Sequence, residues 1–409
     1  MVAYLTAFVI AASVTAVASY VVLRISRRFG LAPAIRARDV HNTPTPRLGG
    51  IAMLIGLFAA FGIASTQRLF GSLFAEGTKV WALLGACAIV AAVGILDDLL
   101  DLDWMIKLAA QLAATGLLAW NGMQIISLPF GDTIVVASPA VNFVITVFLM
   151  TLVMNAVNFV DGLDGLVAGV AIIANSLFFI YTLLLSERQG QVDSVTFASL
   201  IAVIVVGICA GFLPFNWHRA RMFMGDTGAL LVGLLMAAST VSVTGQLNPA
   251  ELNQKLVLAA YIPIILPIAV LALPLADFSL AVFRRLKAGK SPFTADRLHL
   301  HHRLLDMGHS PVQAVLIFYL GSAVLSVAVL LVFTVQSYTL PLIVLVVGGA
   351  LCALLLFFPL QKVRAAAAQR GLIPLKPRVH PDPAQRAGGS DSDITAHPDQ
   401  ERANERTPE

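Results

Sequence analysis

The chain has 409 residues, of which 58% are hydrophobic and only 12% are charged, and its mean hydropathy is +0.84. Soluble domains carry about 25% charged residues, so this composition excludes water-soluble, fibrous and disordered classes and predicts a multispan membrane protein. The net charge of +4 does not indicate a nucleic-acid partner, because the basic residues follow the membrane topology described next.

Apolar runs long enough to cross a bilayer, which takes about 20 residues, recur along the chain. They predict an all-α, polytopic integral membrane protein with about 11 transmembrane helices. The runs lie at 2–23, 48–66, 80–96, 104–121, 139–157, 166–186, 195–213, 227–245, 256–278, 312–335 and 339–360. The end of the chain is rich in Pro, Ala and charge, which predicts a membrane domain over 1–362 and a disordered cytoplasmic tail over 363–409.

The orientation follows from the distribution of Lys and Arg, which concentrate on the cytoplasmic side of membrane proteins. If the N-terminus lies outside, the inner segments other than the tail hold 15 of these residues and the outer segments hold four. The distribution predicts an N-out, C-in protein.

Polar residues gather in four of the segments assigned to the inside, and each segment adjoins a span. Their sequences are DDLLDLD at 97–103, NAVNFVDGLDG at 155–165, MGDTG at 224–228 and TADRLHLHHR at 294–303. All eight histidines also fall on this side, whereas the outer loops carry only single, scattered acidic residues. This asymmetry predicts one shared site, formed by cytoplasmic loops at the membrane face.

The first segment places several carboxylates at the end of a predicted span. If the helix continues through it, Asp97 and Asp101 are neighbours on one face and Asp98 is offset by about 100°. Carboxylates this close resist desolvation unless a cation compensates, and oxygen ligands of this type suit Mg²⁺. The alternative is that these aspartates are only solvent-exposed residues at the end of a helix.

The second segment spaces Asn155, Asn158, Asp161 and Asp164 by three residues, which keeps them on one slowly drifting helical face. Placing polar side chains within a bilayer costs free energy, and such residues are usually functional. This face therefore indicates a surface that binds the hydroxyl groups of a sugar or a base, or that holds the ligands of a metal ion in place. The alternative is a hydrogen-bonded seam between helices.

The third segment places Asp226 at the start of a predicted span, where the helix dipole favours a carboxylate. Asp226 is therefore either part of the shared site or simply the cap of its helix. Nearby Phe223 either stacks on a base or anchors the interface.

The fourth segment combines His and Arg next to the membrane, which suits the oxygens of an anionic phosphate. The alternatives are a zinc site and, for the arginines, a basic face for anionic lipid headgroups. The residues concerned are Arg297, His299, His301, His302 and Arg303.

In this order and on this side, the four segments, together with HNTPTPRLGGIAM at 41–53, resemble the bacterial polyprenyl-phosphate N-acetylhexosamine-1-phosphate transferases, a glycosyltransferase 4-type family. The likeness covers roughly residues 40–320. The most similar subgroup is the UDP-GlcNAc:undecaprenyl-phosphate GlcNAc-1-phosphate transferases, which are multi-pass proteins of the bacterial plasma membrane. The sibling branch, which transfers phospho-N-acetylmuramoyl-pentapeptide, usually has Lys where this chain has Asp101.

The resemblance implies a Mg²⁺-dependent transfer, with Mn²⁺ as an alternative ion, in which polyprenyl phosphate attacks the β-phosphate of UDP-GlcNAc and UMP leaves. It implies Asp97 and Asp98 as catalytic residues and Asp226 and Asp161 as metal ligands. It also implies pairing of two copies. The implied substrate-binding residues are Arg47, Asp101, Lys107, Asn158, Asp164, Phe223, Arg297, His299, His301, His302 and Arg303.

Three alternatives remain at this stage. The chain could be a pentapeptide transferase of peptidoglycan synthesis, or it could transfer another amino sugar such as GalNAc. It could also be an anion transporter, although transporter sites usually lie near the bilayer midplane and these polar residues collect at one side. Within the transferase reading, an acyl-phosphate on Asp97 or Asp98 is the alternative to direct attack.

Overall fold

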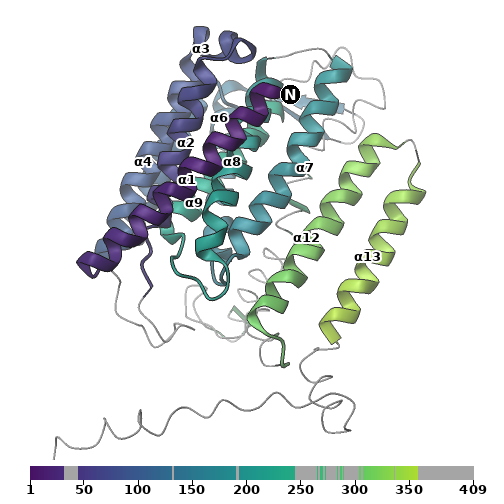
Figure 1. Ribbon diagram of the computed structural model, residues 1–409. Helices are drawn as coiled ribbons and strands as arrows, with labels where there is room; N and C mark the ends of the chain where they lie inside the picture. Colours follow the sequence, from purple (N-terminus) through teal and green to yellow (C-terminus); the bar gives the residue numbers. More distant parts are fainter. Residues whose placement is uncertain are drawn as a thin grey trace, which may run out of the picture. The chain divides into compact units, whose positions relative to one another are not determined.

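The computed structural model (Figure 1) describes residues 1–31, 45–130, 133–189, 193–244, 307–335 and 337–357, and isolated positions between 265 and 304. The predicted span at 256–278 and the predicted tail at 363–409 lie outside the described segments. The same holds for the site residues expected between Arg297 and Arg303.

Ten of the predicted spans coincide with helices of the described segments. They are α1 (Val2–Phe29), α2 (Gly49–Ser65), α4 (Thr78–Leu100), α5 (Trp104–Trp120), α6 (Pro139–Val160), α7 (Leu166–Gln189), α8 (Asp193–Asn216), α9 (Gly225–Thr244), α12 (Pro311–Thr334) and α13 (Thr339–Phe357). Within the described residues, eight helices are long and apolar enough to cross a membrane. The number is nine if α2 and the helical segment after it, bent by 91°, count as one span.

The all-α prediction holds for these spans but misses a hairpin. Strands β1 (Ser127–Phe130) and β2 (Thr133–Val136) pair antiparallel between α5 and α6. The short helices η1 (Arg68–Phe70) and α3 (Gly71–Glu76) fill the turn before α4. Strands of four residues carry too little periodicity to stand out in an apolar sequence.

Helix α9 lies at the centre of the bundle, and this position determines where the polar residues meet. It contacts α2, α4, α6, α7 and α8, and in Figure 1 it lies among these helices. In its most apolar stretch 94% of the residues are buried, against 6% for α13, which packs on α12. Because α9 is buried among these helices, its first turn also lies inside the bundle.

Glycines allow three helices to converge at that first turn. A Cβ on Gly50 of α2 would lie 2.3 Å from the backbone nitrogen of Gly228, and a Cβ on Gly94 of α4 would lie 2.5 Å from Cα of Thr227. Such distances leave no room for any side chain, so close backbone approach here requires glycine.

A hydrogen-bonded seam joins α5 and α6 within the bundle. Nδ2 of Asn155 donates to Oε1 of Gln111 at 2.6 Å, and the hydroxyls of Thr115 and Thr151 lie 3.2 Å apart. The seam interpretation is thus confirmed for Asn155, because its amide pairs with a neighbouring helix.

Candidate active site

The start of α9 is held against the segment that leads into α2. The amide of Phe223 donates to the carbonyl of Pro46 at 2.9 Å, and the amides of Gly49 and Gly50 donate to the carbonyls of Phe223 and Met224 at 3.0 and 2.9 Å. Gly225 has φ of +71°, and a Cβ there would lie 2.2 Å from the carbonyl oxygen of Arg47. This pairing fixes both the motif around Asp226 and the position of Arg47.

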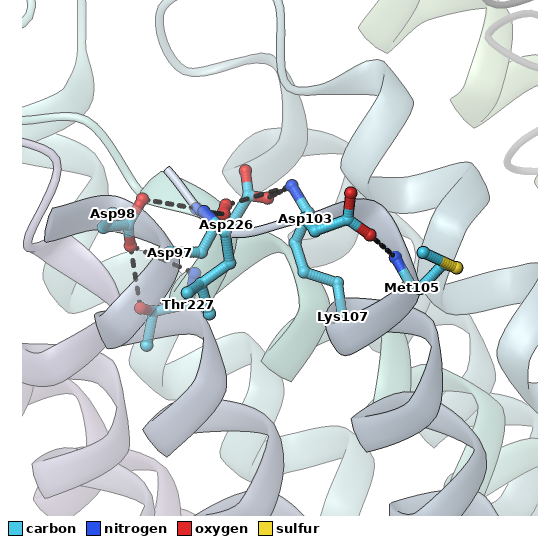
Figure 2. Close-up of polar contacts among 8 residues, drawn as sticks. Asp97, Asp98, Asp103, Met105, Lys107, Asp226 and Thr227 are labelled. Carbon is cyan, nitrogen blue, oxygen red and sulfur yellow. Dashed lines mark hydrogen bonds and ion pairs between the residues drawn. The ribbon is translucent and has the colours of Figure 1, made fainter. Parts of the chain in front are cut away.

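An ion-pair network joins the end of α4, the start of α5 and the start of α9 (Figure 2). Nζ of Lys107 lies 3.1 Å from Oδ2 of Asp97 and 3.3 Å from Oδ2 of Asp226. The amide of Leu102 donates to Oδ1 of Asp97 at 2.8 Å. Three residues that the sequence analysis assigned to the site are therefore in direct contact, although up to 129 residues separate them along the chain.

Asp98 lies beside this network but has different partners. Its Oδ1 accepts from the amide of Asp226 at 3.0 Å, and its Oδ2 accepts from the amide and the hydroxyl of Thr227 at 3.2 and 2.8 Å. Asp98 thus caps the N-terminus of α9 from a different helix. The interpretation of Asp226 as the cap of its own helix is wrong, because Asp98 binds the first amides of α9.

Asp161, half-buried just after α6, lies in a strongly negative environment. Burial and the neighbouring carboxylates of Asp226, Asp98 and Asp164 raise the pKa of Asp161 to about 7, although the Arg47 guanidinium acts in the opposite direction. The four carboxylates therefore lie close enough to interact electrostatically, and Arg47 is near them. A cation would relieve this repulsion.

Asp164 anchors a neighbouring loop. It is buried, its Oδ2 accepts from the amide of Ala220 at 3.1 Å, and Nδ1 of His218 lies 3.3 Å from the same oxygen. Asn216 joins the two segments further, accepting from the amide of Gly165 at 2.9 Å and donating to the carbonyl of Met222 at 3.1 Å.

The other predicted residues differ in their exposure. Asn158 and Phe223 are half-buried. The expectation that Asp101 shares a helical face with Asp97 is wrong, because α4 ends at Leu100 and Asp101 takes a left-handed conformation with φ of +57°. Asp101 is exposed. The predicted residues Arg297, His299, His301, His302 and Arg303 lie outside the described segments.

Thr227, His218 and Asn216 are parts of this site that the sequence did not predict. Thr227 stood within the MGDTG segment and His218 only among the inner histidines, and their partners Asp98 and Asp164 come from other segments. The signal that could have found Thr227 is its place beside Asp226 in the first turn of a predicted helix, where the backbone amides have no partner within the helix and need an acceptor from outside it.

A hollow lined by Lys79, Gln124 and Asp193, among others, lies at the opposite ends of α4, α5, α8 and α9. Helix α4 starts at this hollow and ends at Asp97 and Asp98. Its 23 residues span roughly 35 Å, so the hollow is separate from the acidic network.

The donor set suits a hard cation. Within the described residues, no three side chains of the His, Cys, Asp or Glu type converge as a ready-made metal cage. Mg²⁺ does not need one, since it usually binds through one or two carboxylates together with substrate phosphates. Asp226, together with the phosphates of a bound substrate, would meet that requirement, and Asp161 adds negative charge that interacts with Asp226.

Comparison with known proteins agrees with this arrangement. Residues 80–244, which include Asp97, Asp98, Lys107, Asp161 and Asp226, match glycosyl transferase family 4. The chain is 38% identical over 314 residues to the decaprenyl-phosphate N-acetylglucosaminephosphotransferase of Mycobacterium tuberculosis H37Rv, covering 76% of this chain and 78% of that protein.

Two further relatives carry similar names. A probable undecaprenyl-phosphate N-acetylglucosaminyl 1-phosphate transferase of Bacillus subtilis is 30% identical over 80% of this chain and 84% of its own length. An undecaprenyl-phosphate alpha-N-acetylglucosaminyl 1-phosphate transferase of Escherichia coli K12 is 28% identical over 74% of this chain and 77% of its own length. The family match and the apolar helices together define a multispan membrane transferase. The chain belongs to the polyprenyl-phosphate N-acetylhexosamine-1-phosphate transferases of glycosyl transferase family 4.

Proposed function

We propose that the protein transfers GlcNAc-1-phosphate from UDP-GlcNAc to a polyprenyl phosphate, the first membrane step of a cell-wall or surface glycopolymer. An oxygen of the lipid phosphate forms a bond to the β-phosphorus of UDP-GlcNAc, the bond from that phosphorus to the bridging oxygen breaks, and UMP leaves. The observation that carries the proposal is the contact of Lys107 with Asp97 and Asp226 at one end of the bundle, in a chain of this family.

The chemistry of the reactants matches these residues. A phosphate monoester has a second pKa near 6, so the acceptor is largely dianionic at pH 7 and needs positioning more than deprotonation. Phosphoryl transfer depends on charge neutralisation, which Lys107 and Arg47 supply from the protein. Mg²⁺ bound by Asp226 and Asp161 would neutralise further phosphate charge, and Asp97 orients Lys107 through their ion pair.

We also propose the finer topology: eleven spans, N-out and C-in, with the acidic network at the cytoplasmic face of the plasma membrane. A lipid acceptor and a soluble nucleotide can meet only at such an interface. The basic residues of the inner segments support this orientation. Pairing of two copies stays a prediction from the family resemblance.

The test uses purified full-length protein in detergent with undecaprenyl phosphate and Mg²⁺. UMP release is measured with UDP-GlcNAc, UDP-GalNAc or UDP-MurNAc-pentapeptide. We expect release from UDP-GlcNAc, abolished by EDTA and by Asp226→Ala. Asp193→Asn, at the far end of the bundle, is the matched control and should retain activity. Release only from the pentapeptide substrate, or from no substrate, would contradict the proposal.

A further inference from the structure

Two adjacent aspartates end α4, and they have different partners. Asp97 pairs with the cation Lys107 and with one backbone amide. Asp98 accepts three hydrogen bonds, all of them from the first turn of α9. Because successive helical residues are about 100° apart, each aspartate meets a different neighbour.

We infer that Asp98 and Thr227 form a clamp that positions Asp226, and that Asp98 acts through this clamp rather than on the reacting phosphates. This inference rests on the proposed function, which supplies the reaction that Asp226 serves. Asp98 is then a positioning residue, and Thr227 is a second positioning residue for the same reaction.

The hydrogen bonds that the Asp98 carboxylate accepts are the first argument for this clamp. A carboxylate accepts through about four lone-pair positions, and three of those on Asp98 are filled by donors of α9 at 2.8–3.2 Å. Hydrogen bonds from backbone amides to an anion stabilise its charged form and fix its orientation. Donors of α9 therefore occupy both oxygens of this carboxylate, and this occupation disfavours an attack on phosphorus that would form an acyl-phosphate on Asp98.

The close packing around Thr227 is the second argument for this clamp. Thr227 is fully buried, and its backbone passes so close to Gly94 that a Cβ there would lie 2.5 Å from Cα of Thr227. Gly225, on the other side of Asp226, contacts the same Asp98 carboxylate, since a Cβ there would lie 2.5 Å from Oδ2. Asp226 is thus held between two residues that both lie against Asp98. Its side chain is left to face Lys107 and Asp97 (Figure 2).

The test compares four variants of the full-length protein. Thr227→Ser keeps the hydroxyl, and Thr227→Val removes it with little change in shape. Asp98→Asn weakens the hydrogen bonds that residue 98 accepts from two backbone amides and one hydroxyl of α9. Thr244→Val is the matched control. Thr244 is also a buried threonine of α9, but its hydroxyl donates to the carbonyl of Thr240 at the other end of the helix.

The first readout is hydrogen exchange of the peptide covering the start of α9, measured without metal or substrate. We expect Thr227→Val and Asp98→Asn to speed exchange of the Asp226 and Thr227 amides at least tenfold, and Thr227→Ser and Thr244→Val to leave it unchanged. The second readout is Mn²⁺ affinity by electron paramagnetic resonance. Loss of an outer hydrogen bond typically weakens metal binding 10- to 100-fold, so the first two variants should show that loss.

The third readout is UMP release. Thr227→Val should lower kcat about tenfold at an unchanged KM for UDP-GlcNAc, and Thr227→Ser should restore it. The inference is overturned if Asp98→Asn abolishes turnover while amide exchange and Mn²⁺ affinity stay as in the wild type, because Asp98 would then act on the reactants. Unchanged exchange in Thr227→Val would overturn it as well. If wild-type protein released no UMP, the proposed function would fail, whereas the exchange data would still report on the clamp.

Discussion

At the scale of single residues, identical side chains at one end of the bundle serve different tasks. Asp97 and Asp226 share the ammonium group of Lys107, Asp98 caps α9, and Asp164 holds the loop around His218. The sequence predicted that these residues belong to one site. It could not divide the tasks, because Asp98, Asp164 and Asp226 each depend on a partner more than 50 residues away along the chain.

The titration of Asp161 predicts how stability changes with pH. Because its pKa is raised to about 7 in the folded protein, the folded state holds a proton that the unfolded chain releases near pH 4. In EDTA, the melting temperature should therefore fall as pH rises from 5 to 8. Asp161→Asn should flatten this profile, and Mg²⁺ should raise the melting temperature most at pH 8. A rise in melting temperature over the same range in EDTA would contradict the assignment.

The left-handed backbone at Asp101 predicts opposite effects for two substitutions. Non-glycine residues pay about 1–2 kcal/mol in this conformation, and aspartate tolerates it better than most. Asp101→Gly should therefore keep or raise the free energy of unfolding, whereas Asp101→Val should lower it by about 1–2 kcal/mol. Thermal melts of both variants in detergent measure the difference, and equal melting temperatures would count against a left-handed Asp101.

At the scale of helices, glycines decide how closely the site can be assembled. The hydropathy of the sequence predicts where the helices lie, since it depends only on the composition of each stretch. It does not predict that Gly50 and Gly94 bring α2 and α4 against the first turn of α9. The hairpin of β1 and β2 was not predicted from the sequence either, because each of its two strands is too short to show the alternating hydrophobic pattern of a β-strand.

Gly94→Ala tests this convergence. The added methyl would lie 2.5 Å from Cα and 2.8 Å from the nitrogen of Thr227, both backbone atoms that cannot move aside easily. Overpacking of this kind costs about 1–3 kcal/mol, so we expect a melting temperature several degrees lower and a large loss of UMP release. Gly85→Ala is the control on the same helix. Its methyl would meet a leucine side chain at 3.4 Å, and it should behave like wild type.

At the scale of the whole molecule, the chain separates its chemistry from its membrane contacts. The composition alone predicted a multispan protein, and the described helices confirm it. The number of spans and the orientation are still predictions, because they depend on charges in loops and on a segment outside the described residues.

The N-out, C-in orientation can be tested by labelling cysteines in intact cells. In a variant lacking Cys87, Cys209 and Cys352, Thr66→Cys should react with a membrane-impermeant maleimide. Arg219→Cys should react only after permeabilisation. Both positions are exposed, so the membrane side should decide the outcome. The cysteine-free parent provides the background, and the reverse pattern would show that the orientation is inverted.

The burial of α9 has a consequence for how the protein meets membranes of different thickness. A bilayer that is too thick or too thin acts on the helices that touch its acyl chains, mainly through tilting. Helix α13 is almost wholly exposed to that influence, whereas α9, which carries Asp226 at its end, is almost wholly shielded from it. Outer helices can therefore adapt to the lipid while the acidic network keeps its shape. Turnover in vesicles should vary little with acyl-chain length.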